Sequence, residues 1–294
     1  REEIEFMFNG SIVAMVTPFK DGEVDYDKLG ELVQYHIDNG TNAIIPCGTT
    51  GESPTLTHRE HGEVIGKVIE AAAGRIPVIA GTGSNNTSEA VSMTRHAKET
   101  GADGSLIITP YYNKPTQQGI YEHYKAILEE VDIPIIVYNV PSRTGVSISA
   151  ETVARLAEFD NIVAIKEATG DIDQASQILN LCDITVLSGD DSLTLPIMSI
   201  GGKGVVSVLA NILPREVSEL TSSFLKGEIE NAQRLHNSLF PVCKAMFIET
   251  NPIPVKTAMK LLGRLNGEMR LPLCDMSDEH KRQLKIALEK YGLV

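Results

Sequence analysis

The feature that most constrains this chain is a repeat of short apolar runs, rich in valine and isoleucine, at intervals of about 20 to 35 residues. Most of these runs are continuously apolar rather than alternating, which is typical of strands buried on both faces of a parallel sheet. The sequence contains eight such runs, and we expect each to form a strand: 12–16, 43–46, 78–80, 106–108, 135–137, 162–165, 185–187 and 205–208.

Amphipathic segments fill the intervals between these runs. Leu29, Leu32 and Val33 begin a stripe at helical spacing, and Gly40 stands where a helix is expected to end. Other helix starts are predicted at residues whose side chains cap helices well: Thr57 (with Glu60 three residues later), Ser88, Thr116, Ser149 and Asp171.

Eight strand–helix units in succession favour an α/β fold, a (β/α)8 TIM barrel, over a doubly wound open sheet. The open sheet would usually have fewer strands and a glycine-rich phosphate-binding turn after the first one. After the eighth strand the pattern changes to helices only. We therefore expect a barrel over residues 7–229 and a C-terminal helical appendage over residues 230–294, and we set residues 1–6 apart as an expression remnant ahead of Met7.

Composition excludes several classes of protein. The net charge is −13, with 26 Lys and Arg against 39 Asp and Glu, and without a basic cluster we expect no nucleic-acid partner. The four cysteines form no C-x-x-C pair, which favours a reducing cytosol over a disulfide framework. Without a long apolar run or a signal-peptide pattern, we also expect no membrane partner and a cytoplasmic location.

Polar residues stand where the predicted strands end, which is the catalytic edge of a (β/α)8 barrel. Lys166 ends the apolar run 162–165. Burial there without a close carboxylate would favour the neutral amine, which can attack a carbonyl. Tyr138 ends the preceding strand, so we expect its phenol beside Lys166, where it could relay protons. The alternatives are a lysine that reaches solvent and an ordinary core tyrosine.

Two further features have weaker signals. The loop Gly48–Gly51 follows the second strand, and its N–H groups and hydroxyls could hold a carboxylate, although an ordinary glycine-rich loop would look the same. It lacks the lysine and spacing of a nucleotide-binding loop. His58 and His61 could in principle bind a metal, but no third ligand at a convincing spacing supports them, so we expect no metal.

Six segments in register resemble the dihydrodipicolinate synthase family, and the resemblance runs from about Met7 to the C-terminus without a large insertion. They are 48–52 (GTTGE), 111–115 (YYNKP), 138–145 (YNVPSRTG), 165–169 (IKEAT), 188–191 (SGDD) and 251–256 (NPIPVK). The resemblance implies a pyruvate-dependent aldolase-type barrel on the diaminopimelate route to lysine. It would condense pyruvate with L-aspartate 4-semialdehyde through a lysine Schiff base, without a metal or organic cofactor.

The resemblance also implies the catalytic residues. Lys166 matches the lysine that forms the Schiff base. Tyr138, Tyr112 and either Thr49 or Thr50 match the proton relay, and Thr50 matches its threonine better. Tyr112 would enter the site of a neighbouring subunit, because the family is homotetrameric.

Four residues match the substrate-binding positions of the family: Thr50, Arg143, Gly189 and Val206. Arg143 would hold the carboxylate of the semialdehyde, and Gly189 and Val206 would line the pyruvate end. The resemblance further implies an allosteric site for L-lysine at a subunit interface, formed by Ser53, His58, His61, Asn85, Glu89 and Tyr111.

Two alternatives remain open at the level of sequence. Another aldolase of the same superfamily, such as N-acetylneuraminate lyase or a keto-deoxy-sugar aldolase, shares the Schiff-base half-reaction. Arg143 and the pair Thr49–Thr50 favour the synthase, because a short amino-acid semialdehyde needs a carboxylate anchor more than an array for sugar hydroxyls. The second alternative is a catalytically silent barrel that senses a ligand, which the retention of Lys166, Tyr138 and Arg143 disfavours.

Overall fold

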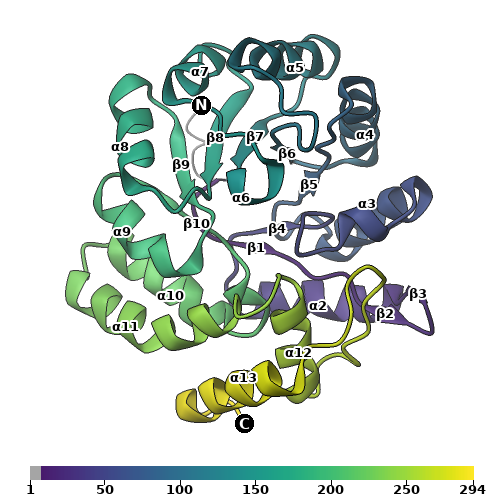
Figure 1. The fold of residues 1–294 in the computed structure, drawn as a ribbon, viewed down its shortest axis with the longest axis vertical. Helices are drawn as coiled ribbons and strands as arrows, with labels where there is room; N and C mark the ends of the chain where they lie inside the picture. Colours follow the sequence, from purple (N-terminus) through teal and green to yellow (C-terminus); the bar gives the residue numbers. More distant parts are fainter. Residues whose placement is uncertain (1–7) are drawn as a thin grey trace.

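The computed structural model describes residues 8–294, in which eight parallel strands form the wall of a barrel with helices around it (Figure 1). The strands are neighbours in the order β4-β1-β10-β9-β8-β7-β6-β5. Their bounds are β1 (Gly10–Ala14), β4 (Ala43–Ile45), β5 (Ile79–Gly81), β6 (Gly104–Ile108), β7 (Ile135–Asn139), β8 (Ile162–Glu167), β9 (Thr185–Ser188) and β10 (Gly204–Ser207).

The barrel closes where β4 meets β5. The backbone N–H of Ile44 donates to the carbonyl of Pro77 at 3.0 Å, and the N–H of Gly81 donates to the carbonyl of Pro46 at 3.0 Å. An isolated parallel bridge between Ile44 and Val78 lies between these two bonds. The predicted (β/α)8 barrel is therefore confirmed over the open-sheet alternative.

Helices cover the outside of the strands. Their bounds are α2 (Tyr26–Asp38), α3 (His58–Ala72), α4 (Thr87–Thr100), α5 (Gln117–Glu130), α7 (Ala150–Leu156), α8 (Ile172–Leu181), α9 (Thr194–Ser199) and α10 (Pro214–Leu225). The short helix α6 (Pro141–Thr144) instead follows β7 and lines the cleft described below. Three 3₁₀ turns stand at η1 (Ser53–Thr55), η2 (Asp191–Leu193) and η3 (Leu209–Asn211).

All eight predicted strands are present, with bounds that differ by one or two residues at most ends. Most predicted helix starts are also confirmed, including the capping box of Thr57 and Glu60. The start of α4 is a correction, because its cap is Asn86, whose side chain accepts from the backbone N–H of Ser88. The short antiparallel hairpin of β2 (Phe19–Lys20) and β3 (Glu23–Val24) was not predicted, since two residues carry no periodicity.

Three helices follow the barrel: α11 (Ile229–Ala245), α12 (Ile253–Leu261) and α13 (Asp278–Tyr291). Helix α13 packs against α11 and α12, and the segment after α12 reaches the β2–β3 hairpin, where Arg270 donates to the carbonyl of Gly22. Leu235 and Leu284 of these helices belong to the same buried cluster as Leu29 and Val64 of the barrel helices. The division at residue 230 stays a prediction, and residues 1–6 lie outside the described part.

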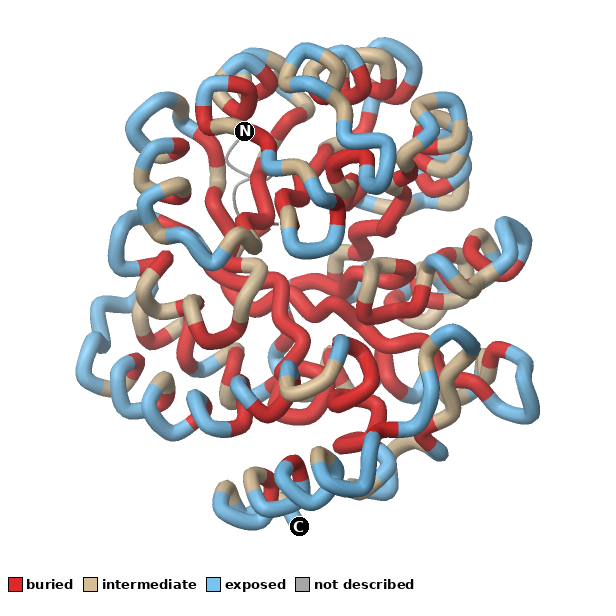
Figure 2. Tube along the Cα trace, viewed as in Figure 1, coloured by how far each residue is buried: buried red, intermediate tan, exposed pale blue. Residues whose placement is uncertain are grey.

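Burial follows the expected pattern, with buried strands at the centre and exposed outer faces on the helices (Figure 2). The continuously apolar runs are buried on both sides, against the barrel interior and against the helix layer. Within residues 8–294, none of the helices has the length and apolar character needed to cross a membrane.

Candidate active site

Tyr138 and Lys166 lie side by side at the carboxyl ends of β7 and β8. The two residues are partners in the register of this parallel strand pair. Both are buried, and the Nζ atom of Lys166 lies 4.1 Å from the centre of the Tyr138 ring. The predicted pairing of phenol and amine is therefore present in the structure. It follows from strand register, because partner residues on neighbouring parallel strands point to the same face.

The environment of Lys166 differs from that of the other buried lysine, Lys256. Lys256 Nζ donates to Glu52 Oε1 at 2.5 Å and to the carbonyl of Thr17 at 2.8 Å. Lys166 Nζ has no carboxylate in ion-pairing contact among residues 8–294. Burial disfavours the ammonium form of an amine unless an anion compensates for it. Of the two buried lysines, Lys166 is therefore the one whose amine lies against a phenol rather than a carboxylate in residues 8–294.

The loop that follows β4 is a tight turn held in a strained conformation. Cys47 and Glu52, at its two ends, have φ angles of 55° and 54°, in the left-handed region that residues with a Cβ rarely adopt. The Thr17 hydroxyl donates to the carbonyl of Gly51 at 2.6 Å and joins this loop to the segment that follows β1. Such strain persists only where neighbouring contacts hold it, and it is frequent at functional sites.

Thr49 and Thr50 have different surroundings in this loop. Thr50 is buried, and its Oγ1 accepts a hydrogen bond of 3.0 Å from Nδ2 of Asn251. Thr49 is half-buried and lines the cleft described below. Asn251 also contacts Arg143, whose Nη2 donates to the Asn251 carbonyl at 3.0 Å. Asn251 therefore links two residues that the sequence analysis predicted to bind substrate.

Gly189 and Val206 stand at the ends of β9 and β10. The N–H of Gly189 donates to the carbonyl of Glu167 at 2.7 Å. A Cβ atom on Gly189 would lie 2.5 Å from the Cβ of Ala168, so only glycine fits there without a shift. Val206 is buried and belongs to the same apolar cluster as Tyr138.

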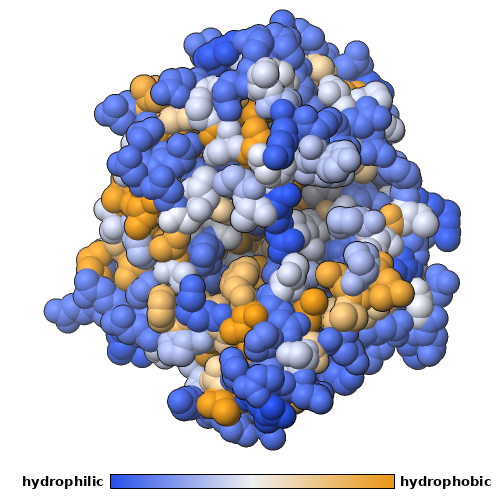
Figure 3. All heavy atoms as spheres, in the orientation of Figure 1, coloured by the Kyte–Doolittle hydropathy of each residue, from blue (hydrophilic) through white to orange (hydrophobic). Residues whose placement is uncertain are grey.

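A cleft of about 1120 Å³ opens beside these residues. Figure 3 shows a largely hydrophilic face that is hollowed between the positions of α3 and α6 in Figure 1. Predicted site residues from five segments line the cleft, namely Thr49, Ser53, His58, His61, Glu89, Tyr111, Tyr112, Tyr138 and Arg143. Lys166, Thr50, Gly189, Val206 and Asn85 are not among the residues that line it.

The residues predicted to bind lysine are partly paired with one another. His58 Nε2 lies 3.1 Å from Glu89 Oε1, and Ser84 donates its hydroxyl proton to the other oxygen of Glu89. His61 Nε2 donates to the carbonyl of Gly81 at 2.9 Å, and burial lowers the pKa of His61. Asn85 does not line the cleft. Its main-chain carbonyl accepts a hydrogen bond from the side chain of Asn113.

Tyr112 is one of the most exposed large side chains in the described chain, with 88% of its surface accessible. Its φ angle is 69°, and its N–H donates to the carbonyl of Thr144 at 3.3 Å. An aromatic ring held outward by a strained backbone is unusual on a free surface, because it exposes apolar area at a conformational cost.

No group of three or more histidine, cysteine, aspartate or glutamate side chains suited to a metal ion occurs in residues 8–294. His58 and His61, the pair considered from sequence, point to different partners as described above.

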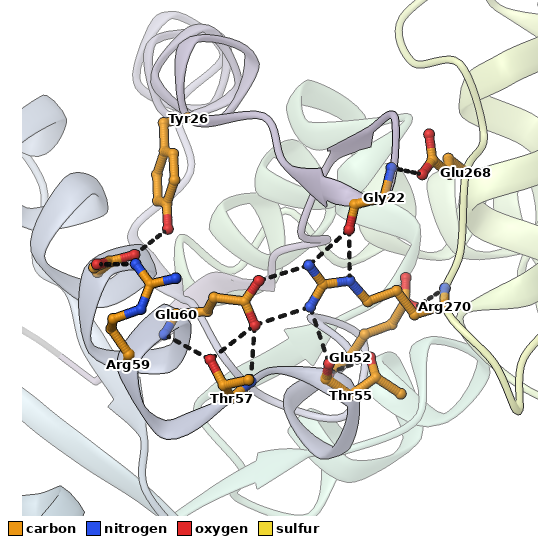
Figure 4. A network of polar contacts seen from close by, with 10 residues as sticks. Gly22, Tyr26, Glu52, Thr55, Thr57, Arg59, Glu60, Glu268 and Arg270 are labelled. Carbon is orange, nitrogen blue, oxygen red and sulfur yellow. Dashed lines mark hydrogen bonds and ion pairs between the residues drawn. The ribbon is translucent and has the colours of Figure 1, made fainter.

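The sequence analysis missed the polar contacts that anchor the mouth of the barrel. Arg270, from the segment after α12, donates two hydrogen bonds to Glu60, at 2.6 and 3.0 Å, and further bonds to the carbonyls of Gly22 and Thr55 (Figure 4). Glu60 also accepts from the N–H of Thr57. The segment 251–256 was noted only as a motif, and no pattern revealed that Lys256 would find Glu52 about 200 residues earlier.

Comparison with known proteins identifies relatives over nearly the whole chain. The model of the dihydrodipicolinate synthetase family matches residues 7–291. A 4-hydroxy-tetrahydrodipicolinate synthase of Geobacter sulfurreducens is 59% identical over 290 residues, which cover 98% of this chain and 100% of the relative. This similarity is far above what a shared fold alone produces.

Solved structures agree with the sequence matches. A dihydrodipicolinate synthase of Acinetobacter baumannii, complexed with pyruvate, has a TM-score of 0.95 and 46% identity and covers 97% of this chain and 99% of its own. A counterpart from Cyanidioschyzon merolae, with lysine bound, has a TM-score of 0.95 and 44% identity, with coverages of 98% and 99%.

The contact between Arg270 and Glu60 predicts how stability depends on pH. Hydrogen bonds from Arg270, and secondarily from Thr57, lower the pKa of Glu60 to about 2. A carboxylate whose pKa is lower in the folded than in the unfolded state stabilises the fold above the unfolded pKa, about 4.3. This stabilisation is lost as the pH falls from about 5 toward 2.

We expect Arg270→Met to lower the free energy of unfolding by about 1 kcal/mol or more at pH 7, and by progressively less as the pH falls below 5. Urea unfolding at several pH values measures this difference. Arg59→Met is the matched control, because Arg59 pairs with Glu63 on the exposed face of α3 and contributes little. A difference for Arg270→Met that is equally large at pH 3 and pH 7 would contradict the role of Glu60.

Proposed function

The chain belongs to the dihydrodipicolinate synthetase family, and on this premise we propose how its residues carry out the reaction. It is a 4-hydroxy-tetrahydrodipicolinate synthase, an aldolase-type lyase of lysine biosynthesis that condenses pyruvate with L-aspartate 4-semialdehyde through a lysine Schiff base. Lys166 is the nucleophile. The observation that carries this assignment is its buried amine, in register with Tyr138 and without a carboxylate partner.

The reaction begins when the neutral amine of Lys166 attacks the ketone carbon of pyruvate. The carbinolamine loses water, with its oxygen protonated as it leaves, and an imine to Lys166 forms. The hydroxyl of Thr50, in the tight loop after β4, donates to the carboxylate of pyruvate. Gly189 and Val206 line this end of the site, and Gly189 leaves room that a larger residue would fill.

The imine then makes the methyl group of pyruvate acidic. Loss of a methyl proton leaves an enamine, because the electron pair of the broken C–H bond is delocalised to the imine nitrogen. Tyr138 lies against the Lys166 amine and is placed to move this proton. Thr49, which lines the cleft with Tyr138 and Tyr112, is better supported by its surroundings as the relay threonine than Thr50, which the sequence analysis preferred.

The enamine carbon attacks the aldehyde of the semialdehyde, and the new alkoxide takes up a proton from the relay. Arg143, at the mouth of the cleft, holds the carboxylate of this second substrate. The amine of the substrate then attacks the imine carbon and displaces Lys166, which closes the six-membered ring. Every step uses groups of the chain and its substrates, so the proposal includes no metal and no organic cofactor.

Association of several copies is part of the proposal. Tyr112 is exposed in the single chain and is held there by a strained backbone, which supports a role in the site of a neighbouring subunit. A homotetramer fits this role and the family. A cytoplasmic location stays a prediction, supported by four cysteines that form no disulfide.

The rival functions are less well supported. A sugar aldolase would need an array of donors and acceptors for hydroxyls, whereas a short amino-acid semialdehyde needs a carboxylate anchor, which Arg143 offers in the cleft. A silent sensor would have no use for a desolvated amine against a phenol. The trapping experiment below separates a catalyst from a sensor.

L-Lysine is the proposed effector. Ser53, His58, His61, Glu89 and Tyr111 line the same cleft as the relay residues, which supports an effector site next to the reaction site. Glu89 offers a carboxylate for an ammonium group, at present paired with His58. Asn85 stays part of the proposed lysine site, and its main-chain carbonyl accepts a hydrogen bond from the side chain of Asn113.

Pyruvate with borohydride should attach one reduced pyruvate to Lys166, because only an imine is reduced to a stable secondary amine. Peptide mass spectrometry locates the adduct. Lys166→Arg should abolish labelling and lower kcat at least about 10³-fold. The control Lys203→Arg changes an exposed lysine and should leave both unchanged. An adduct on another lysine would disprove the assignment.

Arg143→Ala should raise KM for aspartate semialdehyde about 10- to 100-fold, since a charge-assisted bidentate contact is lost. Its effect on pyruvate trapping should be less than about threefold. The control Arg155→Ala removes an arginine that stacks on Tyr121 on the outer helix layer and should change neither value. Equal losses in both half-reactions would mean that Arg143 only supports the structure.

Millimolar L-lysine should inhibit the enzyme partially, and Glu89→Ala should relieve this inhibition while the uninhibited rate changes by less than about twofold. The matched control is Glu99→Ala, at the far end of the same helix, which should stay sensitive. Full activity of the unaltered enzyme at about 10 mM lysine, a concentration above the usual range of KM values, would reject the effector site.

A further inference from the structure

We propose that Asn251 is a positioning residue that orients the hydroxyl of Thr50 for binding the pyruvate carboxylate. The proposal rests on the proposed function, in which Thr50 binds that carboxylate. The juxtaposition that suggests it is the hydrogen bond from Asn251 Nδ2 to Thr50 Oγ1, 3.0 Å long and buried, across about 200 residues of sequence.

The direction of this hydrogen bond decides what the hydroxyl can do. A hydroxyl has one proton to donate and two lone pairs that accept. Asn251 Nδ2 is a donor only, so Thr50 Oγ1 accepts from it and keeps its own proton free. A carboxylate can only accept. The amide therefore holds Thr50 as a donor toward an anion rather than as an acceptor.

The contacts of Asn251 differ from those of an asparagine that only fills a structural role. In Asn211, also buried at the end of the barrel, Oδ1 accepts from the N–H of Val16 and Nδ2 donates to two carbonyls. In Asn251, Oδ1 is buried without a partner among residues 8–294. Leaving a buried acceptor unpaired costs stability. The side chain is thus held for its bond to Thr50 at the expense of the fold.

The segment that carries Asn251 is fixed on both sides of this bond. Lys256, in the first turns of α12, forms its ion pair with Glu52 at the far end of the same loop that holds Thr50. The guanidinium of Arg143 donates to the main-chain carbonyl of Asn251. The side chains of Asn251 and Lys256, from one segment, therefore both bond to one loop, and these contacts fix the main chain from which the Asn251 amide extends.

The bond of Arg143 to the main chain provides an internal control for the test. Substitutions of the Asn251 side chain remove the contact with Thr50 but leave the carbonyl that Arg143 contacts. A positioning role for Thr50 therefore predicts a selective effect on pyruvate. A general loosening of the mouth predicts equal effects on both substrates.

We expect Asn251→Ala to raise KM for pyruvate about threefold to tenfold, as for the loss of one hydrogen bond, with kcat and KM for the semialdehyde within twofold. Asn251→Asp should raise KM for pyruvate more, although it changes the side-chain shape less. Its carboxylate would accept the proton of Thr50 and turn it away from the substrate. Steady-state kinetics and the pyruvate concentration needed for half-maximal borohydride trapping measure these effects.

The matched control is Asn266→Ala, because Asn266 also donates its amide to a distant segment, the carbonyl of Phe19, but lies away from the cleft. Its kinetic constants should stay within twofold. Melting temperatures show whether each variant folds, and Asn251→Ser replaces Asn251→Ala if that variant does not.

A double-mutant cycle with Thr50→Val tests the positioning role of Asn251 separately from the proposed role of Thr50. If Thr50→Val raises KM for pyruvate and Asn251→Ala adds nothing to it, the positioning role is supported. If Thr50→Val has its effect but Asn251→Ala has none, or adds its full effect independently, the positioning role is overturned and the proposed function stands. If Thr50→Val leaves KM for pyruvate unchanged, the proposed role of Thr50 itself fails.

Discussion

The ion pair between Lys256 and Glu52 is the contact on which the mouth of the barrel depends. Both side chains are almost completely buried, and the lysine has a second bond to the carbonyl of Thr17. Burial lowers the pKa of Lys256, while Glu52 acts in the opposite direction and favours its charge. Removing one partner of such a pair leaves an uncompensated buried charge, at a cost of about 3–5 kcal/mol. The pair thereby fixes α12 to the loop after β4.

The other buried lysine, Lys166, has different surroundings, and these suit the role of nucleophile proposed for it. Lys166 is buried against Tyr138 at the end of β8, and no carboxylate pairs with it in the described chain. In the described chain, one buried lysine is thus bound to a carboxylate, and the other has its amine against a phenol. The carboxylate next to Lys166 in sequence, Glu167, bonds to Asn139 instead, because successive strand residues point to opposite faces.

Much of the fold and part of the site follow from local patterns. The continuously apolar runs predict the eight strands, and the strand ends predict where Tyr138 and Lys166 lie, because parallel strands of a barrel share one carboxyl edge. Short elements such as the β2–β3 hairpin are too brief for a pattern to appear. The cap of α4 was assigned to Ser88 rather than Asn86 because both residue types cap helices equally well.

The sequence by itself determined the barrel, the catalytic edge and, through six segments in register, the family. Only the tertiary structure decided which groups meet across long stretches of chain. Asn251 contacts Thr50 and Arg143, and Arg270 contacts Glu60, over separations of about 100 to 200 residues. Periodicity reports which face of an element is buried, but not which side chain lies opposite. Long-range polar pairing depends on how the packed elements are finally oriented, and no local pattern records it.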